Sequence, residues 1–122
     1  MIDKRGLRNQ YKETMVPMGV FVIKNKVNNR VYVVGSANME GAMNRNRFEL
    51  KLKTHRNKKL LKDWLEHGAE NFSFEVLDII KQRDDPLFDY KRELATLLEM
   101  WQEELSCYGE NGYNRAKANT LD

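Results

Sequence analysis

Residues 19–35 read GVFVIKNKVNNRVYVVG, two runs rich in β-branched residues separated by a short polar segment. The first run is MGVFVIKN at 18–25 and the second is VYVVG at 31–35. β-Branched side chains favour extended strands because they pack well on a pleated surface. Between the runs, Asn28 and Asn29 tolerate the positive φ of a tight turn better than other non-glycine residues. The stretch therefore predicts a β-hairpin.

Two helices are expected after the hairpin, the first over MNRNRFELKLK at 43–53. Ser36 or Asn38 can cap its start, since their side chains accept hydrogen bonds from free backbone N–H groups. At helical spacing, its side chains expected to face the core are Met43, Phe48 and Leu52. The second helix follows a break at 54–57, and Gly68 can end it. Its apolar stripe is expected to comprise Leu60, Leu61, Trp64 and Leu65.

One more strand and one long helix are expected in the C-terminal half. FSFEVLDII at 72–80 alternates between two faces, as a strand does. One face is expected to carry Phe72, Phe74, Val76 and Asp78. Asp85 followed by Pro86 is typical of a helix N-cap with proline at the first helical position. The apolar stripe of this helix is expected to be Leu87, Tyr90, Leu94, Leu97, Leu98, Trp101 and Leu105.

The resulting order is β, β, α, α, β, α, with an arm or short helix at 1–17 and a tail expected to fray at 117–122. Residues 18–116 are expected to form one α/β (α+β) domain, a small mixed sheet of about three strands flanked by helices. No apolar run approaches the roughly 18 to 20 residues of a membrane helix, so no membrane partner is expected. The single cysteine, Cys107, excludes an internal disulfide and favours a cytoplasmic protein.

Basic residues are concentrated in one part of the chain. Residues 24–62 contain eleven Lys and Arg and two acidic residues, whereas 63–122 contain six basic and fourteen acidic residues. A basic surface backed by an acidic one favours a polyanionic partner, and we expect nucleic acid, DNA in the first place. The pattern does not set the oligomeric state. The residues expected to contact phosphates are Lys26, Arg45, Lys51, Lys53, Arg56, Lys58 and Lys59.

The hairpin resembles the opening of the GIY-YIG nucleases, whose first strand carries Gly-Ile-Tyr and whose second carries Tyr-Ile-Gly. The corresponding segments here are GVF at 19–21 and VVG at 33–35. A basic helix, the later helix ELATLLEMWQEEL and the closing NGYN at 111–114 follow in the same order. The resemblance covers roughly residues 18–116. The pattern N-R-x-R-F at 44–48 is most similar to a branch of small stand-alone bacterial members.

The resemblance implies metal-assisted hydrolysis of phosphodiesters, with Mg²⁺ or Mn²⁺ as the cofactor if the protein is active and none otherwise. In this family a tyrosine helps to activate water or attacks the phosphate. An arginine supports the phosphate charge, and one glutamate holds the cation. One carboxylate can suffice, because Mg²⁺ keeps several of its own waters.

The candidate catalytic residues implied by the resemblance are Phe21, Tyr32, Arg47, His55 and Asn114. Phe21 occupies the position of the first-strand tyrosine and lacks its hydroxyl. Tyr32 precedes Gly35 by three residues, whereas the family tyrosine precedes its glycine by two. One extra residue reverses the facing of a strand, so a β-bulge at Val33–Val34 is expected if Tyr32 is to face the site.

Apolar residues occupy the family's arginine and glutamate positions, Met43 and Leu98. Arg47 lies one helical turn beyond Met43 and is the candidate replacement. Glu99, next to Leu98, is the candidate metal ligand, and Glu75 and Glu93 are further carboxylates for that role. Three functions stay open: an active endonuclease, an inactive nucleic-acid-binding module of the same fold, and a protein-interaction domain.

Overall fold

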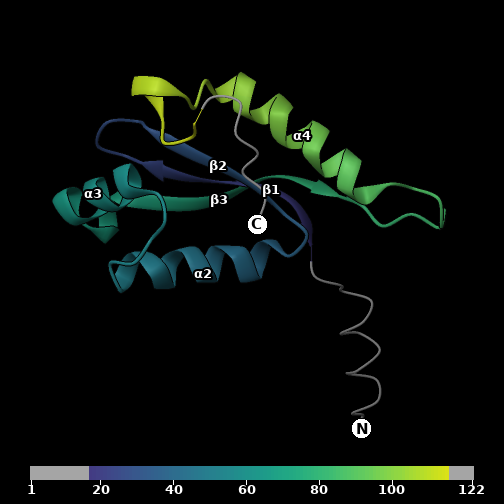
Figure 1. Cartoon of the computed structure of the whole chain (residues 1–122), viewed down its shortest axis with the longest axis horizontal. Helices are drawn as coiled ribbons and strands as arrows, with labels where there is room; N and C mark the ends of the chain where they lie inside the picture. Colours follow the sequence, from purple (N-terminus) through teal and green to yellow (C-terminus); the bar gives the residue numbers. More distant parts are fainter. Residues whose placement is uncertain (1–16, 116–122) are drawn as a thin grey trace, which may run out of the picture.

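The computed structural model of the chain describes residues 17–115. Three strands form one sheet in the order β2-β1-β3, and both pairings are antiparallel. Helices α2 and α3 cover one side of the sheet and α4 covers the other (Figure 1). The elements are β1 (Met18–Asn25), β2 (Val31–Ser36), α2 (Met39–Lys51), α3 (Lys58–His67), η1 (Ala69–Asn71), β3 (Phe72–Ile80), α4 (Tyr90–Leu105) and η2 (Gly109–Asn111). The expected three-stranded sheet flanked by helices is confirmed, but its strands are antiparallel throughout and the sheet is not mixed.

The predicted hairpin is confirmed, and its register is regular from Gly19 opposite Ser36 to Lys24 opposite Val31. The backbone N–H of Asn25 donates to the carbonyl oxygen of Arg30 at 2.9 Å and closes the loop. Asn29 adopts a φ of 65° inside this loop. An asparagine tolerates this left-handed conformation at low cost, and its presence here explains why the chain turns at this point.

Alternation along β1 divides the interior into two hydrophobic cores. Phe21 and Ile23 face α2 and α3, whereas Val20 and Val22 face α4. The first core contains Phe21, Ile23, Tyr32, Val34, Met39, Ala42, Leu50, Leu60, Leu61, Phe72 and Tyr113. The second contains Val20, Val22, Val31, Val33, Ile80, Leu94, Leu98 and Cys107. Each large apolar side chain stabilises the fold by about 1.5 to 3 kcal/mol when it is fully buried.

Helix α2 begins at Met39, with Asn38 as its N-cap, and its buried side chains are Met39, Ala42, Asn46 and Leu50. The prediction that Phe48 and Leu52 face the core is wrong, because their exposed fractions are 61% and 53%. The polar residue Asn46 occupies a buried position and so obscures the true apolar face in the sequence. In α3, Leu65 was assigned to the apolar stripe and is also exposed. Gly68, with a φ of 91°, ends α3 as predicted.

Helix α4 begins at Tyr90, and its N-cap is Asp89, whose carboxylate accepts from the N–H of Arg92. The predicted start at Asp85 is therefore wrong. The Asp85 carboxylate accepts a hydrogen bond from the N–H of Leu87, and the Asp85 carbonyl oxygen accepts one from the N–H of Phe88. Asp85 therefore closes a separate turn. Leu87, expected on the stripe, is 90% exposed as a result.

Strand β3 carries a bulge that the alternating pattern did not reveal. Val20 pairs with Asp78 and Phe21 with Val76, which leaves Leu77 as the extra residue on β3. Asp78 was expected on the same face as Val76. It lies instead on the α4 side, where its carboxylate accepts from Trp101 Nε1 at 3.1 Å.

The segment after α4 covers the outer edge of β2. Its backbone bridges Val31 at Gly112 in a parallel arrangement, and the N–H of Tyr113 donates to the carbonyl oxygen of Val31 at 2.9 Å. A Cβ atom at Gly112 would collide with the carbonyl of Cys107, so the chain needs glycine there. This segment prevents the edge of β2 from pairing with another chain. The predicted arm at 1–17 lies outside the described residues except for Pro17. The predicted tail at 117–122 lies outside them as well.

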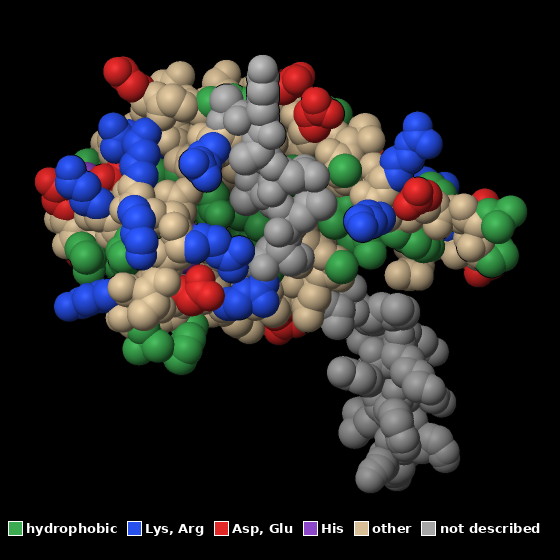
Figure 2. All heavy atoms as spheres, viewed as in Figure 1, with side chains coloured by type: hydrophobic (Ala, Val, Ile, Leu, Met, Phe, Trp, Pro, Cys, Tyr) green, Lys and Arg blue, Asp and Glu red, His purple; other side chains and the backbone are tan. Residues whose placement is uncertain are grey.

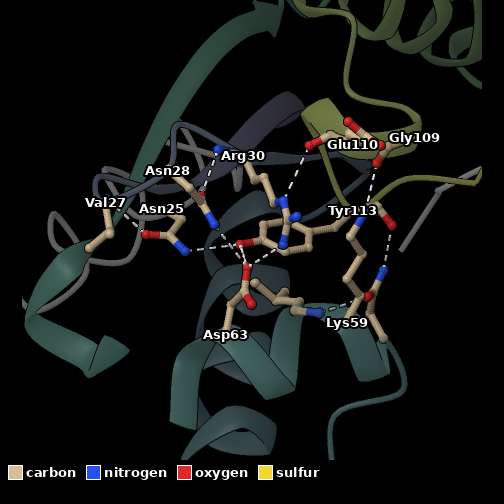
Figure 3. Close-up of polar contacts among 11 residues, drawn as sticks. Asn25, Val27, Asn28, Arg30, Lys59, Asp63, Gly109, Glu110 and Tyr113 are labelled. Carbon is tan, nitrogen blue, oxygen red and sulfur yellow. Dashed lines mark hydrogen bonds and ion pairs between the residues drawn. The ribbon is translucent and has the colours of Figure 1, made fainter. Parts of the chain in front are cut away.

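The buried carboxylate of Asp63, on α3, joins three parts of the chain (Figure 3). Its Oδ2 accepts from the Tyr113 hydroxyl at 2.7 Å, from Arg30 Nη1 at 3.0 Å and from Asn28 Nδ2 at 3.2 Å. Burial alone raises the pKa of Asp63, but the hydrogen bonds from Tyr113, Asn28 and Arg30 outweigh burial and hold that pKa below its usual value. Within residues 17–115, no helix has the length and apolar character needed to cross a membrane.

Replacing Asp63 with alanine is expected to lower the free energy of unfolding by about 2 to 3 kcal/mol. The change leaves the buried Tyr113 hydroxyl without its acceptor and removes the ion pair with Arg30. Urea denaturation measures the difference. Glu66→Ala, at an exposed carboxylate on the same helix, is the matched control. Equal stability of the two variants would contradict a central role for Asp63.

The contribution of Asp63 to stability is expected to disappear in acid. The folded-state pKa lies below the ordinary value of 3.8, so ionised Asp63 stabilises the protein fully above about pH 4. This contribution is lost as the pH falls from there through the folded-state pKa, because over that range the unfolded state binds the proton more readily than the folded state does. The difference in unfolding free energy between wild type and Asp63→Asn is therefore expected to shrink between about pH 5 and pH 2. A constant difference across that range would refute the assignment; Glu66→Gln controls for the lost charge.

Candidate functional site

Tyr32 faces the same side of the sheet as Phe21 without any bulge in the hairpin. It lies opposite Ile23 in a regular register, and Val34 lies opposite Phe21. Residues two apart on a strand share a face, so Tyr32 points into the core beneath α2 and α3. The expectation that Tyr32 needs a bulge at Val33–Val34 is therefore wrong.

Tyr32 is surrounded by three residues that differ in charge. The His55 ring meets its ring edge-on, with centroids 5.9 Å apart and planes at 78°. Burial raises the pKa of Tyr32; the nearby Arg56 charge opposes this increase and the Glu49 charge adds to it. The phenol is thus protonated at neutral pH and can serve as a hydrogen-bond donor, but it is a poor nucleophile.

His55 is fully buried and both of its ring nitrogens are engaged. Nδ1 accepts from the N–H of Asn57 at 3.0 Å, so we assign the ring proton to Nε2, which donates to Asn46 Oδ1 at 2.6 Å. Asn46 Nδ2 in turn donates to the carbonyl oxygen of Ala42 at 2.7 Å. Burial lowers the pKa of His55, which favours this neutral form. The histidine proposed for catalysis therefore ties the loop after α2 to the middle of α2.

Two other predicted catalytic residues are built into the sheet. Phe21 is fully buried in the first core. The Asn114 side chain pairs with the backbone of Val33 as a neighbouring strand would. Its Oδ1 accepts from the N–H at 2.8 Å, and its Nδ2 donates to the carbonyl oxygen at 2.9 Å. Both residues support the hairpin from which Tyr32 projects.

Arg47 lies away from the phenol of Tyr32, over β3. Its guanidinium carbon is 4.3 Å from the centre of the Phe74 ring, and Nη1 donates to Asn44 Oδ1 at 3.4 Å. The half-buried Met43 packs against the first core in its place. The arginine whose charge does reach Tyr32 is Arg56, which the sequence analysis assigned only to phosphate contacts. In the sequence, the signal that could have pointed to Arg56 was its position directly after His55.

The family's metal position does not fit a cation in this chain. Leu98, which the resemblance aligns with the family's metal glutamate, is 1% exposed and packs in the second core, on the side of the sheet opposite Tyr32. Glu99, the candidate ligand, is exposed on α4, and Glu93 and Glu75 are exposed as well. A cation needs oxygen ligands, and Leu98 offers none.

A second acidic group lies on α3. Among residues 17–115, Asp63, Glu66 and His67 place potential ligand atoms within 4.8 Å of one another. The Oδ2 atom of Asp63 already accepts three hydrogen bonds and its charge is paired with Arg30. The group therefore serves the fold and is not an argument for a metal centre.

The seven cations proposed to contact phosphates are all exposed, and we call them the basic surface: Lys26, Arg45, Lys51, Lys53, Arg56, Lys58 and Lys59. Figure 2 shows Lys and Arg side chains gathered over the part of the molecule formed by α2 and α3. Two members also hold the fold together. Lys59 Nζ donates to the carbonyl oxygen of Gly109 at 2.6 Å, and Lys58 Nζ donates to that of His55 at 3.2 Å.

Comparison with known proteins gives structural relatives alone: no family model matches the chain, and neither does any curated protein. Two solved structures of the catalytic domain of I-TevI are similar, one titled as an intron endonuclease in mutant form and the other as a homing endonuclease. The first has a TM-score of 0.69 and 29% identity, and the match covers 84% of this chain and 97% of that one. The second has a TM-score of 0.67 and 29% identity, with 82% and 99% covered. I-TevI is a GIY-YIG nuclease, and the chain described here has the GIY-YIG nuclease fold.

Proposed function

We propose that this protein binds DNA through the basic surface and that it is a binding form of the nuclease fold rather than a cutting one. The observation that carries the second part is the burial of Leu98, the apolar residue that the resemblance aligns with the family's metal glutamate. The structural neighbours are catalytic domains of endonucleases, and a homing endonuclease acts on DNA. That likeness supports DNA as the partner.

The basic surface supports binding because its cations come from adjoining elements. They lie in the hairpin loop, along α2, in the loop after it and at the start of α3. Residues 24–62 contain two acidic residues: Glu40, at the start of α2, and Glu49, which is half-buried. A surface of this kind neutralises backbone phosphates and releases counterions, which gives affinity without reading sequence.

Three chemical groups that the family uses for hydrolysis are absent from the positions of this chain that the resemblance aligns with them. Phe21 has no hydroxyl to orient water, and Met43 has no guanidinium to support phosphate charge. Leu98 has no oxygen for a cation. Each loss removes a group that could stabilise the transition state, and one missing hydrogen-bond donor to the developing charge alone costs about 10²- to 10³-fold in rate. Binding does not need these groups.

DNA binding is expected to weaken when Lys53 and Arg56 are both changed to glutamine. If both contact phosphates, the affinity falls about tenfold or more at about 0.1 M salt. The slope of log affinity against log salt should also become shallower by about 1 to 2. The readout is fluorescence anisotropy of a labelled duplex at several salt concentrations. Lys91→Gln with Arg92→Gln, two exposed cations on α4, removes the same charge from the other side. An equal effect of the two double variants would remove the basic surface from the proposal.

Hydrolysis with a rearranged site is the second candidate, and one observation favours it. Arg56 and Glu49 both lie close enough to Tyr32 to alter its pKa, so a cation and a carboxylate accompany the surviving tyrosine. Tyr32 is only 7% exposed, however, and burial raises its pKa. Little of Tyr32 is therefore within reach of a phosphate in this structure.

Supercoiled plasmid is expected to stay intact when the purified protein is added with Mg²⁺ or Mn²⁺, at the same level as with EDTA. Agarose-gel separation of nicked and supercoiled forms provides the measurement. The contrary result is metal-dependent nicking that both Tyr32→Phe and Arg56→Gln abolish. That result would replace the binding proposal with the second candidate. Nicking that persists in both variants would come from a contaminating nuclease.

A further inference from the structure

A surface cavity of about 510 Å³ lies between α2, α3 and the start of β3. Its lining includes four aromatic residues and two cations, and none of its lining residues is acidic. The aromatic residues are Phe48, Trp64, Phe72 and Phe74, and the cations are Arg47 and Lys51. We call this cavity the aromatic pocket. Its volume is within the range of roughly 300 to 1,000 Å³ that is usual for small-ligand sites.

The aromatic rings form a base and an exposed edge. Phe72 is buried at the base, and the Trp64 ring lies against it with centroids 5.2 Å apart and planes at 46°. Phe48 stands on the edge with 61% of its surface exposed to solvent. An exposed phenylalanine gains free energy when a flat apolar surface covers it. The pocket is therefore suited to a planar ring.

Helix α2 supplies the polar part of the pocket from one face. Asn44, Arg47, Phe48 and Lys51 are spaced at i, i+3, i+4 and i+7, so they lie in one row along the helix. The Arg47 guanidinium stacks over Phe74, which orients it at the rim. Lys51, one turn further along, is also a member of the basic surface. The pocket is thus continuous with the surface proposed to hold the DNA backbone.

We propose that the aromatic pocket takes one unpaired base of single-stranded DNA, which stacks on Phe48 and Trp64 while Arg47 and Lys51 contact the adjacent phosphates. This inference rests on the proposed DNA binding and assigns it a substrate class. Aromatic rings stack on any base, because every base has a π-face, and cations beside them follow the backbone. A base paired inside a duplex is already stacked and cannot enter. The protein therefore prefers single strands, or duplexes with unpaired bases, over continuous duplex.

The test compares three labelled DNAs of equal length, about 12 nucleotides, with the full-length protein. One is a single strand, one is the same strand with abasic sites throughout its centre, and one is a duplex. The wild type is expected to bind the single strand at least fivefold more tightly than either of the others. Phe48→Ala is expected to weaken binding of the single strand by about 5- to 100-fold and to change abasic binding by less than about twofold. Met100→Ala, at another half-exposed apolar residue on α4, is the matched control and is expected to have no effect.

The outcomes separate the two proposals. If Phe48→Ala binds all three DNAs as the wild type does, with salt-dependent affinity intact, the pocket is not a base site and the basic surface stands. Tighter binding to duplex than to single strand also overturns the inference. If the wild type binds none of the three DNAs, the proposed DNA binding fails together with it. Phe48 is largely exposed, so its replacement is not expected to unfold the protein.

Discussion

The hydrogen bonds to Asp63 are the interaction on which the arrangement of the α2 and α3 side of the sheet depends. One buried carboxylate oxygen of Asp63 accepts hydrogen bonds from Asn28 and Arg30 in the hairpin loop and from Tyr113 in the C-terminal segment. The same Tyr113 accepts at its carbonyl oxygen from Asn57 Nδ2 at 2.8 Å. Because Asn57 is also the N-cap of α3, the carboxylate and the loop before the helix are fixed together. A buried carboxylate needs this many donors, since burial without them is costly.

The two cores show how residues that the resemblance assigns to catalysis are used in this fold. Leu98, which the resemblance aligns with the family's metal glutamate, is buried among valines and leucines. A leucine gains free energy in that position, whereas an unpaired carboxylate would lose it. His55, in the loop on the other side of the sheet, is likewise committed to Asn46 and to the backbone of Asn57. Residues that suggest catalysis in the sequence therefore contribute to stability in the structure.

The surface above the first core combines two properties that nucleic-acid-binding surfaces use. Cations surround the loop after α2, and an exposed phenylalanine stands in the same helix row as Arg47 and Lys51. Charge gives long-range attraction to a polyanion, and a stacked ring gives short-range contact with a base.

The sequence by itself determined the hairpin, the element order and the end of α3 at Gly68, and it narrowed the cap of α2 to Ser36 or Asn38, because each of these depends on neighbours within a few residues. The sequence wrongly predicted that Phe48 faces the core, because Asn46 occupies a core position in α2. There its side chain forms a hydrogen bond with His55, nine residues away. The sequence also misplaced Asp78, since a bulge in β3 is set by pairing with β1. Only the tertiary structure brought the charges of Arg56 and Glu49 near enough to influence the pKa of Tyr32 and gathered the aromatic pocket from two helices and a strand. Contacts of this kind arise from packing between distant segments, which local periodicity does not encode.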